Sequence, residues 1–475
     1  MLMDRIAIIH NPGLYYPLNP PFHPSVSYPE YPWKTTAPSP NPVYDAVRQT
    51  LIDLGLDREN LGLPSWNPLK ELIQPGNTVL IKPNFVIHFH PDGEDMNCVV
   101  THPSIIRGIL DYAVIALKNH GKIIIGDAPV QSCRVEEILA WNGLPAVIDF
   151  IQQNSDIQIE FRDLRETVIR LEKHSIISSR RKNPVKVTSV NLGTASMLEG
   201  IIQDAHLFGV DGYDQRETVQ SHQPGRHIYD IHSLVYEVDA IINIPKLKTH
   251  KKAGITGAIK SSVGLNANKD RLPHFRSGSP ADGGDEYPVT NVFRETYRRL
   301  SQLMEKTDNK IVRYLIVGAL YLIRKIFELQ KFYLVETGAW PGNDTLWRMI
   351  YDLTKIIYFS DSQGKIHPEI QRKVFHLVDG IIAGEKKGPL RPSPRRCGVL
   401  IAGFNPFIID AAACELMGFD YRKVKSVAGI QDLFPVEPAE AAITLNGQAA
   451  PFESLRQQIK PSFIPAHGWE EIIAP

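Results

Sequence analysis

Short apolar runs alternate with amphipathic stretches along most of the chain. Apolar runs bounded by Gly, Pro or Asp are typical of central strands that are covered on both faces. We expect strands at 78–82, 122–126, 156–161, 185–191, 238–244, 374–378 and 398–402. Helical stretches lie between several of them, at 43–54, 102–119, 136–142 and 406–417. The pattern predicts an α/β fold, with mostly parallel sheet(s) and flanking helices.

The pattern changes to long helices between residues 296 and 366. Segment 310–333 is apolar nearly all round its middle and has Arg or Lys at both ends. We expect it to be a buried helix of an inserted bundle. The alternative is a helix that contacts a membrane surface or a partner protein. Its longest apolar run, 314–323, has ten residues, which is fewer than the roughly 20 that a membrane-spanning helix needs.

These changes predict four parts in the chain. They are an α/β core with a Pro-rich N-terminal arm (1–295), a helical insertion (296–366), a continuation of the core (367–435) and an extended C-terminal tail (436–475). Proline is frequent at 11–43 and excludes regular helix or central strand there, because it lacks the backbone N–H. The aromatic residues of the same stretch favour an ordered arm on the surface.

Composition excludes several classes of protein. The 475 residues include 52 Lys and Arg and 52 Asp and Glu, whereas a general nucleic-acid coat protein needs surplus positive charge. The four cysteines form no C-x-x-C pair, so we expect no iron–sulfur cluster. Scattered thiols and an N-terminus without a leader pattern predict a cytoplasmic protein.

Polar residues follow five of the predicted strands. They are Lys82 with Asn84, Asp127, Lys246 with Lys248, Asp379, and Asn405. Ligands of open α/β sheets bind beyond the carboxyl ends of the strands. We therefore expect these residues to converge on a polar, partly cationic cleft.

Segment 245–265, PKLKTHKKAGITGAIKSSVGL, carries the strongest local signal. Gly254 and Gly257 allow close backbone approach, and a helix can begin directly after them. A glycine-rich turn before a helix start is a candidate cradle for phosphate or carboxylate, although neither a Walker A nor a dinucleotide motif is present. We expect partial burial and a functional role for Lys260, and a solvated surface pair for Lys251 and Lys252.

Histidines suggest two kinds of chemistry. His250 and His274 flank the same loop, and we predict that they act as general acid and base. His88, His90 and His102 form a looser group, for which a metal site and plain loop roles both stay open. Asp379 and Glu385 are further metal candidates, or they neutralise lysines. A divalent metal and a nucleotide-type cofactor both remain open.

The segment GNDTLWR (342–348) predicts a capped helix. Asn343 or Asp344 suits the cap position. Asp344, Arg348 and Asp352 are spaced four apart, so they would share one face of that helix as ion pairs.

The sequence resembles the DUF362 family of uncharacterised proteins. The matching pieces are VLIKPNFV (79–86), THPSIIRGILDYA (101–113), IIIGDAP (123–129), 239–265, GNDTLWRMIYDL (342–353), DGIIAGEKKGPL (379–390) and 398–420. Some members carry a cysteine-rich ferredoxin-like segment that this chain lacks. The resemblance supplies no reaction.

A more remote similarity is to lactate racemase and its relatives, which bind a nickel pincer nucleotide. Thr101, His102, Pro103 and Ser104 are similar to a family segment T-R-P-x-P-S. His250, Ala253, Gly254, Thr256, Gly257, Lys260 and Ser261 are similar to a second segment, whose lysine holds the cofactor. His102 stands where that family has a phosphate-contacting Arg, and Ala258 replaces a glycine. The similarity implies shared ancestry and a shared cleft position, and by itself it does not establish nickel binding.

Together these patterns favour an enzyme that acts on an anionic small molecule, with racemase- or epimerase-like chemistry. Lys82, Lys246, Lys248 and Lys260 would hold anionic groups. His250 and His274 would move protons, and Asp127 and Asp379 would orient them or hold a metal. Two alternatives stay open. One is a non-catalytic ligand-binding or membrane-associated accessory protein in envelope polysaccharide or lipid metabolism, which would use 310–333. The other is a metal-dependent hydrolase that uses His88, His90 and His102.

Overall fold

The computed structural model describes residues 3–474, except 173–174, 181–184, 211–212, 291–294, 298, 301–302, 305–306, 308, 330–336 and 460–462. Its main sheet has eleven strands, with the order β18-β17-β1-β16-β15-β11-β2-β3-β4, and β12 and β13 pair beside β15. These strands are β1 (Arg5–His10), β2 (Thr78–Pro83), β3 (Lys122–Asp127), β4 (Gln158–Asp163), β11 (Ala240–Ile244), β12 (Lys246–His250), β13 (Gly254–Thr256), β15 (Val374–Lys387), β16 (Arg391–Gly403), β17 (Ala442–Leu445) and β18 (Gln448–Ala449).

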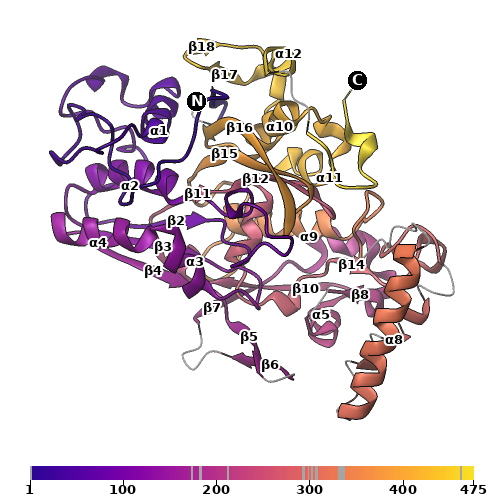
Figure 1. Cartoon of the computed structure of the whole chain (residues 1–475). Helices are drawn as coiled ribbons and strands as arrows, with labels where there is room; N and C mark the ends of the chain where they lie inside the picture. Colours follow the sequence, from indigo (N-terminus) through magenta and orange to yellow (C-terminus); the bar gives the residue numbers. More distant parts are fainter. Residues whose placement is uncertain are drawn as a thin grey trace.

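Helices cover both faces of this sheet (Figure 1). Side chains alternate between the faces along each strand, so Val79 and Ile81 of β2 join one core and Leu80 joins the other. One core is shared with α1 (Pro42–Asp53), α2 (Pro103–Leu117), α3 (Val135–Asn142) and α4 (Leu144–Asn154). The other is shared with α9 (Leu346–Phe359), α10 (Pro406–Met417) and α11 (Lys425–Ala428). The predicted α/β fold is confirmed.

Strand direction decides which predicted strand ends meet. β15, β11, β2, β3 and β4 run parallel to their neighbours in this series. β16 is antiparallel to β15 and to β1, so its carboxyl end lies at the opposite edge. Asn405, which follows β16, accepts the amides of Phe407 and Ile408 and caps α10. The expectation that Asn405 belongs to the cleft is therefore wrong.

Smaller elements pack around the main sheet. They are β5 (Thr167–Glu172) with β6 (Ser175–Arg180), β7 (Val187–Asn191) with β10 (Arg226–His232) and β9 (His222–Gln223), β8 (Phe208–Gly209) with β14 (Phe275–Arg276), and the short helices α5 (Gln215–Ser221), α6 (Leu234–Glu237) and α12 (Leu455–Ile459). The predicted strand at 185–191 thus belongs to a small separate sheet. At the C-terminus, β17 pairs with β1 in parallel.

The two long helices of the 296–366 region differ in their surroundings. α9 is buried in one of the two cores. α8 (Lys310–Leu329) stands away from the body (Figure 1), and Ile311, Leu315 and Leu322 are 72%, 70% and 62% exposed. The expectation of a buried bundle helix is wrong for 310–329, and 330–333 lie outside the described residues. Within the described part of the chain, no helix combines the length and apolar character that a bilayer crossing requires.

Candidate functional site

A cavity of about 250 Å³ lies beyond the carboxyl ends of β2 and β3, and we call it the lysine-rich cavity. Seven residues singled out from the sequence line it: Lys82, Asn84, Asp127, Lys248, His250, Lys260 and His274. Further polar lining residues are Tyr213, Lys251, Lys252, Thr256, Ser261 and Lys269. Positions that are far apart in the sequence therefore meet around one hollow.

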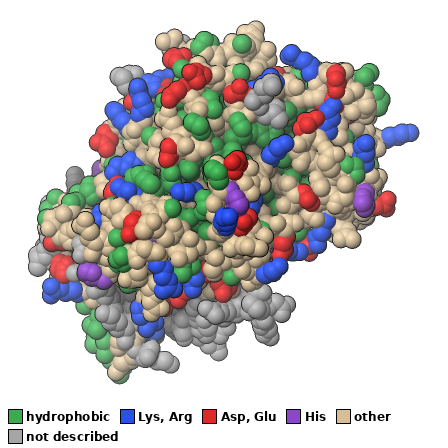
Figure 2. Space-filling model, turned by 180° about the vertical axis from the view of Figure 1, so that it is seen from behind, with side chains coloured by type: hydrophobic (Ala, Val, Ile, Leu, Met, Phe, Trp, Pro, Cys, Tyr) green, Lys and Arg blue, Asp and Glu red, His purple; other side chains and the backbone are tan. Residues whose placement is uncertain are grey.

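Positive charge dominates the lining. Six lysines and one carboxylate, that of Asp127, are among the lining residues. The Nζ of Lys82 lies 3.0 Å from Asp127 Oδ1 and donates to Ser261 Oγ at 2.9 Å. Figure 2 shows both charge signs interspersed over the face it draws, so the surface there does not share this excess. Among the described lining residues, amines therefore outnumber carboxylates.

Among the described residues, two of the remaining lysines donate only to neutral backbone carbonyls. Lys248 Nζ donates to Val99 O at 2.6 Å, and Lys269 Nζ donates to Val263 O at 2.5 Å. Burial lowers the pKa of each of these lysines to about 7, and neighbouring lysines add to the effect. A bound anion would offset this cost of burial, because opposite charge favours the protonated form.

Lys260 begins a 3-10 turn, η5 (Lys260–Leu265), at the cavity wall. Among the residues that the structure describes, its Nζ has neither a hydrogen-bond acceptor nor a carboxylate partner. Burial, and then the charges of Lys252 and Lys82, lower the pKa of Lys260 to about 8. This lysine is therefore the lining amine that the fold itself engages least.

The hydrogen-bond partners of His250 and His274 assign opposite tautomers to the two rings. His250 Nδ1 accepts the amides of Lys252 and Ala253, both at 3.1 Å, so its proton is on Nε2. His274 Nδ1 lies 2.7 Å from Leu272 O and must donate to it, which leaves a lone pair on Nε2. Burial and then nearby lysines lower the pKa of both rings well below the usual 6.5. A neutral donor and a neutral base thus line the same cavity.

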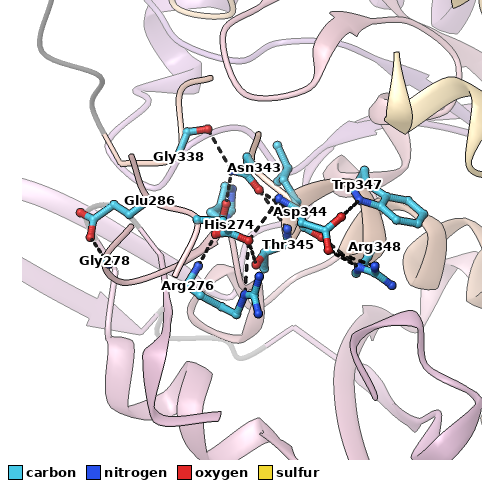
Figure 3. Close-up of polar contacts among 12 residues, drawn as sticks. His274, Arg276, Gly278, Glu286, Gly338, Asn343, Asp344, Thr345, Trp347 and Arg348 are labelled. Carbon is cyan, nitrogen blue, oxygen red and sulfur yellow. Dashed lines mark hydrogen bonds and ion pairs between the residues drawn. The ribbon is translucent and has the colours of Figure 1, made fainter. Parts of the chain in front are cut away.

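The loop that carries His274 is fixed by the GNDTLWR segment (Figure 3). Asn343 Nδ2 donates to His274 O at 2.8 Å and to Gly338 O at 2.9 Å. Asn343 Oδ1 accepts the amides of Thr345 and Leu346, so its side chain holds the turn that leads into α9, whose N-cap position is Thr345. The segment therefore contributes to the position of the base and not to the lining.

The ion-pair face predicted for the same helix forms only in part. Asp344 pairs with Arg348 at 3.0 Å. Asp352 is buried and instead accepts from Ser196, the Met197 amide and Tyr229.

Four other predicted site residues lie outside the lining. Lys246 and Asp379 form a buried ion pair with each other. The His102 ring stacks on Tyr16 with 4.1 Å between centroids, and its Nδ1 accepts the Ser104 amide. Thr101 donates from Oγ1 to Ile244 O at 2.7 Å. The expectation that these four side chains enter the cleft is wrong.

The candidate metal residues also have separate partners. His88 Nδ1 accepts the Arg134 amide, and His90 Nε2 lies 2.9 Å from Pro392 O. Glu385 accepts the Ile464 amide at 3.1 Å. Across the described residues, no three His, Cys, Asp or Glu side chains are placed to hold a metal ion. The ring nitrogens and the carboxylate point to separate backbone partners, so of the two roles left open from the sequence the described contacts support the plain loop role.

The glycine-rich turn does not offer its amides to a ligand. Asp410 accepts the amides of Ala258 at 2.6 Å and Ile259 at 3.0 Å. A Cβ on Gly257 would lie 2.1 Å from Asp410 Oδ1, so the glycine makes room for this carboxylate. The predicted backbone cradle is therefore already occupied, and lysine side chains surround the cavity instead.

Sequence reasoning missed several lining residues. Lys252, expected at the surface, is 8% exposed, and Lys269 is 6% exposed. Thr256 Oγ1 is buried without a hydrogen-bond partner among the described atoms. A signal for Lys269 was present, since it lies between Lys260 and His274 in the sequence.

Comparison with known proteins identifies a family and structural neighbours of low sequence identity. The model of the family described as "Domain of unknown function (DUF362)" matches residues 79–179 and 176–415. A crystal structure of a Thermotoga maritima protein is similar with 11% identity, covering 82% of this chain and 59% of that chain, at a TM-score of 0.32. The lactate racemase apoprotein from Thermoanaerobacterium thermosaccharolyticum shows 14% identity, covering 79% and 55%, at a TM-score of 0.29. The matched regions thus span just over half of each neighbour's length. No curated protein matches the chain.

Proposed function

The chain belongs to the DUF362 family, and from this premise we propose that it is an enzyme that moves a proton on an anionic small molecule bound in the lysine-rich cavity. The observation that carries the proposal is the charge of the lining, with six lysines and a single carboxylate. A phosphate or carboxylate group would complement this charge through charge-assisted hydrogen bonds.

The two histidines supply the proton chemistry. His274 Nε2 has a free lone pair and suits a general base, and His250 Nε2–H suits a donor to a substrate oxygen. A base and a donor in one cavity support abstraction of a proton from a carbon next to a carbonyl or hydroxyl group. We infer a racemase- or epimerase-like reaction, with the lysines holding the anionic end of the substrate.

Calorimetric titration with inorganic phosphate, and separately with malonate, tests the binding step. Lys269→Gln should weaken binding of the preferred anion about tenfold, which corresponds to about 1.4 kcal/mol. Lys186→Gln is the matched control, because that lysine is 79% exposed and pairs with Glu237. Failure of the wild-type protein to bind either anion, or equal weakening in the control, would contradict the proposal.

Deuterium incorporation tests the reaction step. The protein is incubated in D2O with a panel of 2-hydroxy acids, 2-oxo acids and sugar phosphates. The deuterium content of the recovered compounds is then measured by mass spectrometry. At least one compound should gain deuterium, and His274→Gln should slow that gain at least a hundredfold. A panel without any gain in the wild type would count against proton transfer while leaving anion binding in place.

The exposed face of α8 favours a second candidate role, association with an anionic membrane surface. Ile311, Leu315 and Leu322 are exposed there, and segment 310–325 contains four Lys or Arg and no Asp or Glu. This combination suits an interfacial helix on anionic lipid. The protein should float with phosphatidylserine-containing vesicles, less with phosphatidylcholine alone, and not after Leu315→Glu with Leu322→Glu. Absence of flotation of the wild type would remove this role.

A further inference from the structure

We propose that Lys260 is a nucleophile that forms an imine with a carbonyl group of the ligand held in the lysine-rich cavity. The inference rests on the proposed function for the site of binding and adds a covalent step to it. It also narrows the ligand class to a carbonyl compound with a phosphate or carboxylate group.

Lys260 differs from its neighbours in what its amine contacts. Lys82 pairs with Asp127, Lys248 and Lys269 donate to carbonyl oxygens, and Lys252 lies 3.4 Å from Thr337 Oγ1 and 5.7 Å from the Phe275 ring centroid. Within the described part of the chain, Lys260 Nζ has no such partner. Lys251 also has an interaction partner. The fold thus commits the other five lining lysines to contacts within the protein and leaves the Lys260 amine, at the cavity wall, without one among the described residues.

The surroundings of Lys260 favour its neutral amine, which is the reactive form. Burial is the largest cause, and the nearby charges of Lys252 and Lys82 add to it, so the pKa of Lys260 falls to about 8. A lysine with its ordinary pKa near 10.4 is almost wholly protonated at neutral pH. Desolvation beside another cation is an established way to activate a lysine for imine formation.

The step balances without an oxidant or a reductant. The lone pair of the neutral Lys260 Nζ attacks the carbonyl carbon, a C–N bond forms, and one Nζ proton passes to the carbonyl oxygen. The second Nζ proton then passes to the same oxygen, which leaves as water as the C–O bond breaks and the C=N bond forms. His250 lines the same cavity as Lys260, and its Nε2–H can donate a hydrogen bond to the departing oxygen.

An imine would also serve the proton transfer of the proposed function. A protonated imine withdraws electrons from the adjacent carbon and makes its C–H bond more acidic than in the parent carbonyl. His274 lines the same cavity as Lys260, so the base and the nucleophile face one ligand space. Lys260 and His274 together suit removal of a proton from the carbon next to the imine.

Reductive trapping tests the proposal on the full chain. The protein is treated with sodium cyanoborohydride and either pyruvate, which offers a carboxylate, or dihydroxyacetone phosphate, which offers a phosphate. Peptide mapping by mass spectrometry should find one reduced adduct, on Lys260, with one of the two compounds. An adduct spread evenly over many lysines, or no adduct with either compound, would overturn the proposal.

Lys260→Arg separates charge from nucleophilicity, because arginine stays cationic but does not form the imine. The amount of adduct formed by the variant should be at least tenfold lower than in the wild type. Its affinity for inorganic phosphate should stay within about threefold of the wild-type value. Lys186→Arg should trap as the wild type does. Full trapping in Lys260→Arg would contradict the assignment. If the wild type binds phosphate but gives no trapped adduct, the imine is contradicted and the proposed function is not. If the wild type binds no anion, the proposed function is contradicted as well.

The pH dependence of trapping gives a second measurement that needs no variant. In the wild type, the initial rate of adduct formation should rise with a midpoint near pH 8, because the neutral amine reacts. A rate that continues to rise toward pH 10 would be that of an ordinary exposed lysine and would contradict the proposal.

Discussion

Lys246 and Asp379 form an ion pair with 3.0 Å between Nζ and Oδ2, and both side chains are completely buried. The hydroxyl of Tyr16, from the Pro-rich arm, lies within hydrogen-bonding distance of both groups. The His102 amide donates to the same carboxylate at 3.0 Å. The pair therefore joins the arm and the start of α2 to the central sheet, beside the lysine-rich cavity.

Asp379→Asn should destabilise the protein strongly. Removal of one partner leaves an uncompensated buried charge, which costs about 3–5 kcal/mol. Glu237→Gln breaks the exposed pair with Lys186 and should cost at most about 1 kcal/mol. Urea unfolding measures both changes. A wild-type free energy of unfolding for Asp379→Asn would show that the buried pair contributes little to stability.

Which strand ends meet at the cavity can be predicted from the sequence. The side-chain contacts next to the cavity cannot be predicted as well. Lys82 and Asp127 end neighbouring parallel strands, so their proximity follows from topology alone. The pairing of Lys246 with Asp379 depends on how β12 pairs with the long strand β15, where the register shifts. Such a register has no signal in a single sequence.

The roles of the histidines are likewise predictable from the sequence only in part. His250 and His274 reach one cavity because the glycine loop and η5 bring their segments together. His88 and His90 are close in the sequence, yet each ring finds a different backbone partner. The direction of a loop side chain depends on tertiary packing, so spacing alone does not distinguish a ligand set from structural histidines.

Asp410 should make stability depend on pH. Burial raises the pKa of this carboxyl to about 7 in the folded protein, against 3.8 without the fold. The folded state therefore holds the proton more tightly. The resulting stabilisation is present in full below about pH 4 and is lost as the pH rises to about 7. The shift sets an upper bound of about 4 kcal/mol on the effect.

Urea unfolding of the wild type and of Asp410→Asn at pH 4.5 and pH 8 checks this contribution. The Asp410 carboxylate accepts hydrogen bonds from two backbone N–H groups. In the variant, the side-chain NH2 group faces one of these N–H groups and cannot accept from it. The resulting loss of stability is the same at both pH values. Stability should fall by less between pH 4.5 and pH 8 in the variant. A parallel fall in both proteins would show that Asp410 does not titrate in this range.

The tautomers of the two cavity histidines can be read directly by ¹⁵N NMR. At pH 7 we expect His250 to carry its proton on Nε2 and His274 to carry its proton on Nδ1, as their backbone partners require. Because burial and the lysines lower the pKa of both rings, neither should become protonated between pH 7 and pH 5.5. His250→Gln and His274→Gln assign the signals. Titration of either ring near pH 6.5 would contradict the neutral acid–base pair.

Two glycines with opposite surroundings test how tightly the cavity wall is packed. A Cβ on Gly264 would lie 2.3 Å from Asp127 Oδ1 and 2.7 Å from Lys82 Nζ, whereas nothing lies within 4 Å of one on Gly318 in α8. Gly264→Ala should therefore push apart the Lys82–Asp127 pair, cost about 1–3 kcal/mol and weaken phosphate binding. Gly318→Ala should be neutral or stabilise α8 by up to about 1 kcal/mol. Urea unfolding and phosphate titration measure both variants, and a Gly264→Ala protein with wild-type stability and affinity would show that the wall yields easily.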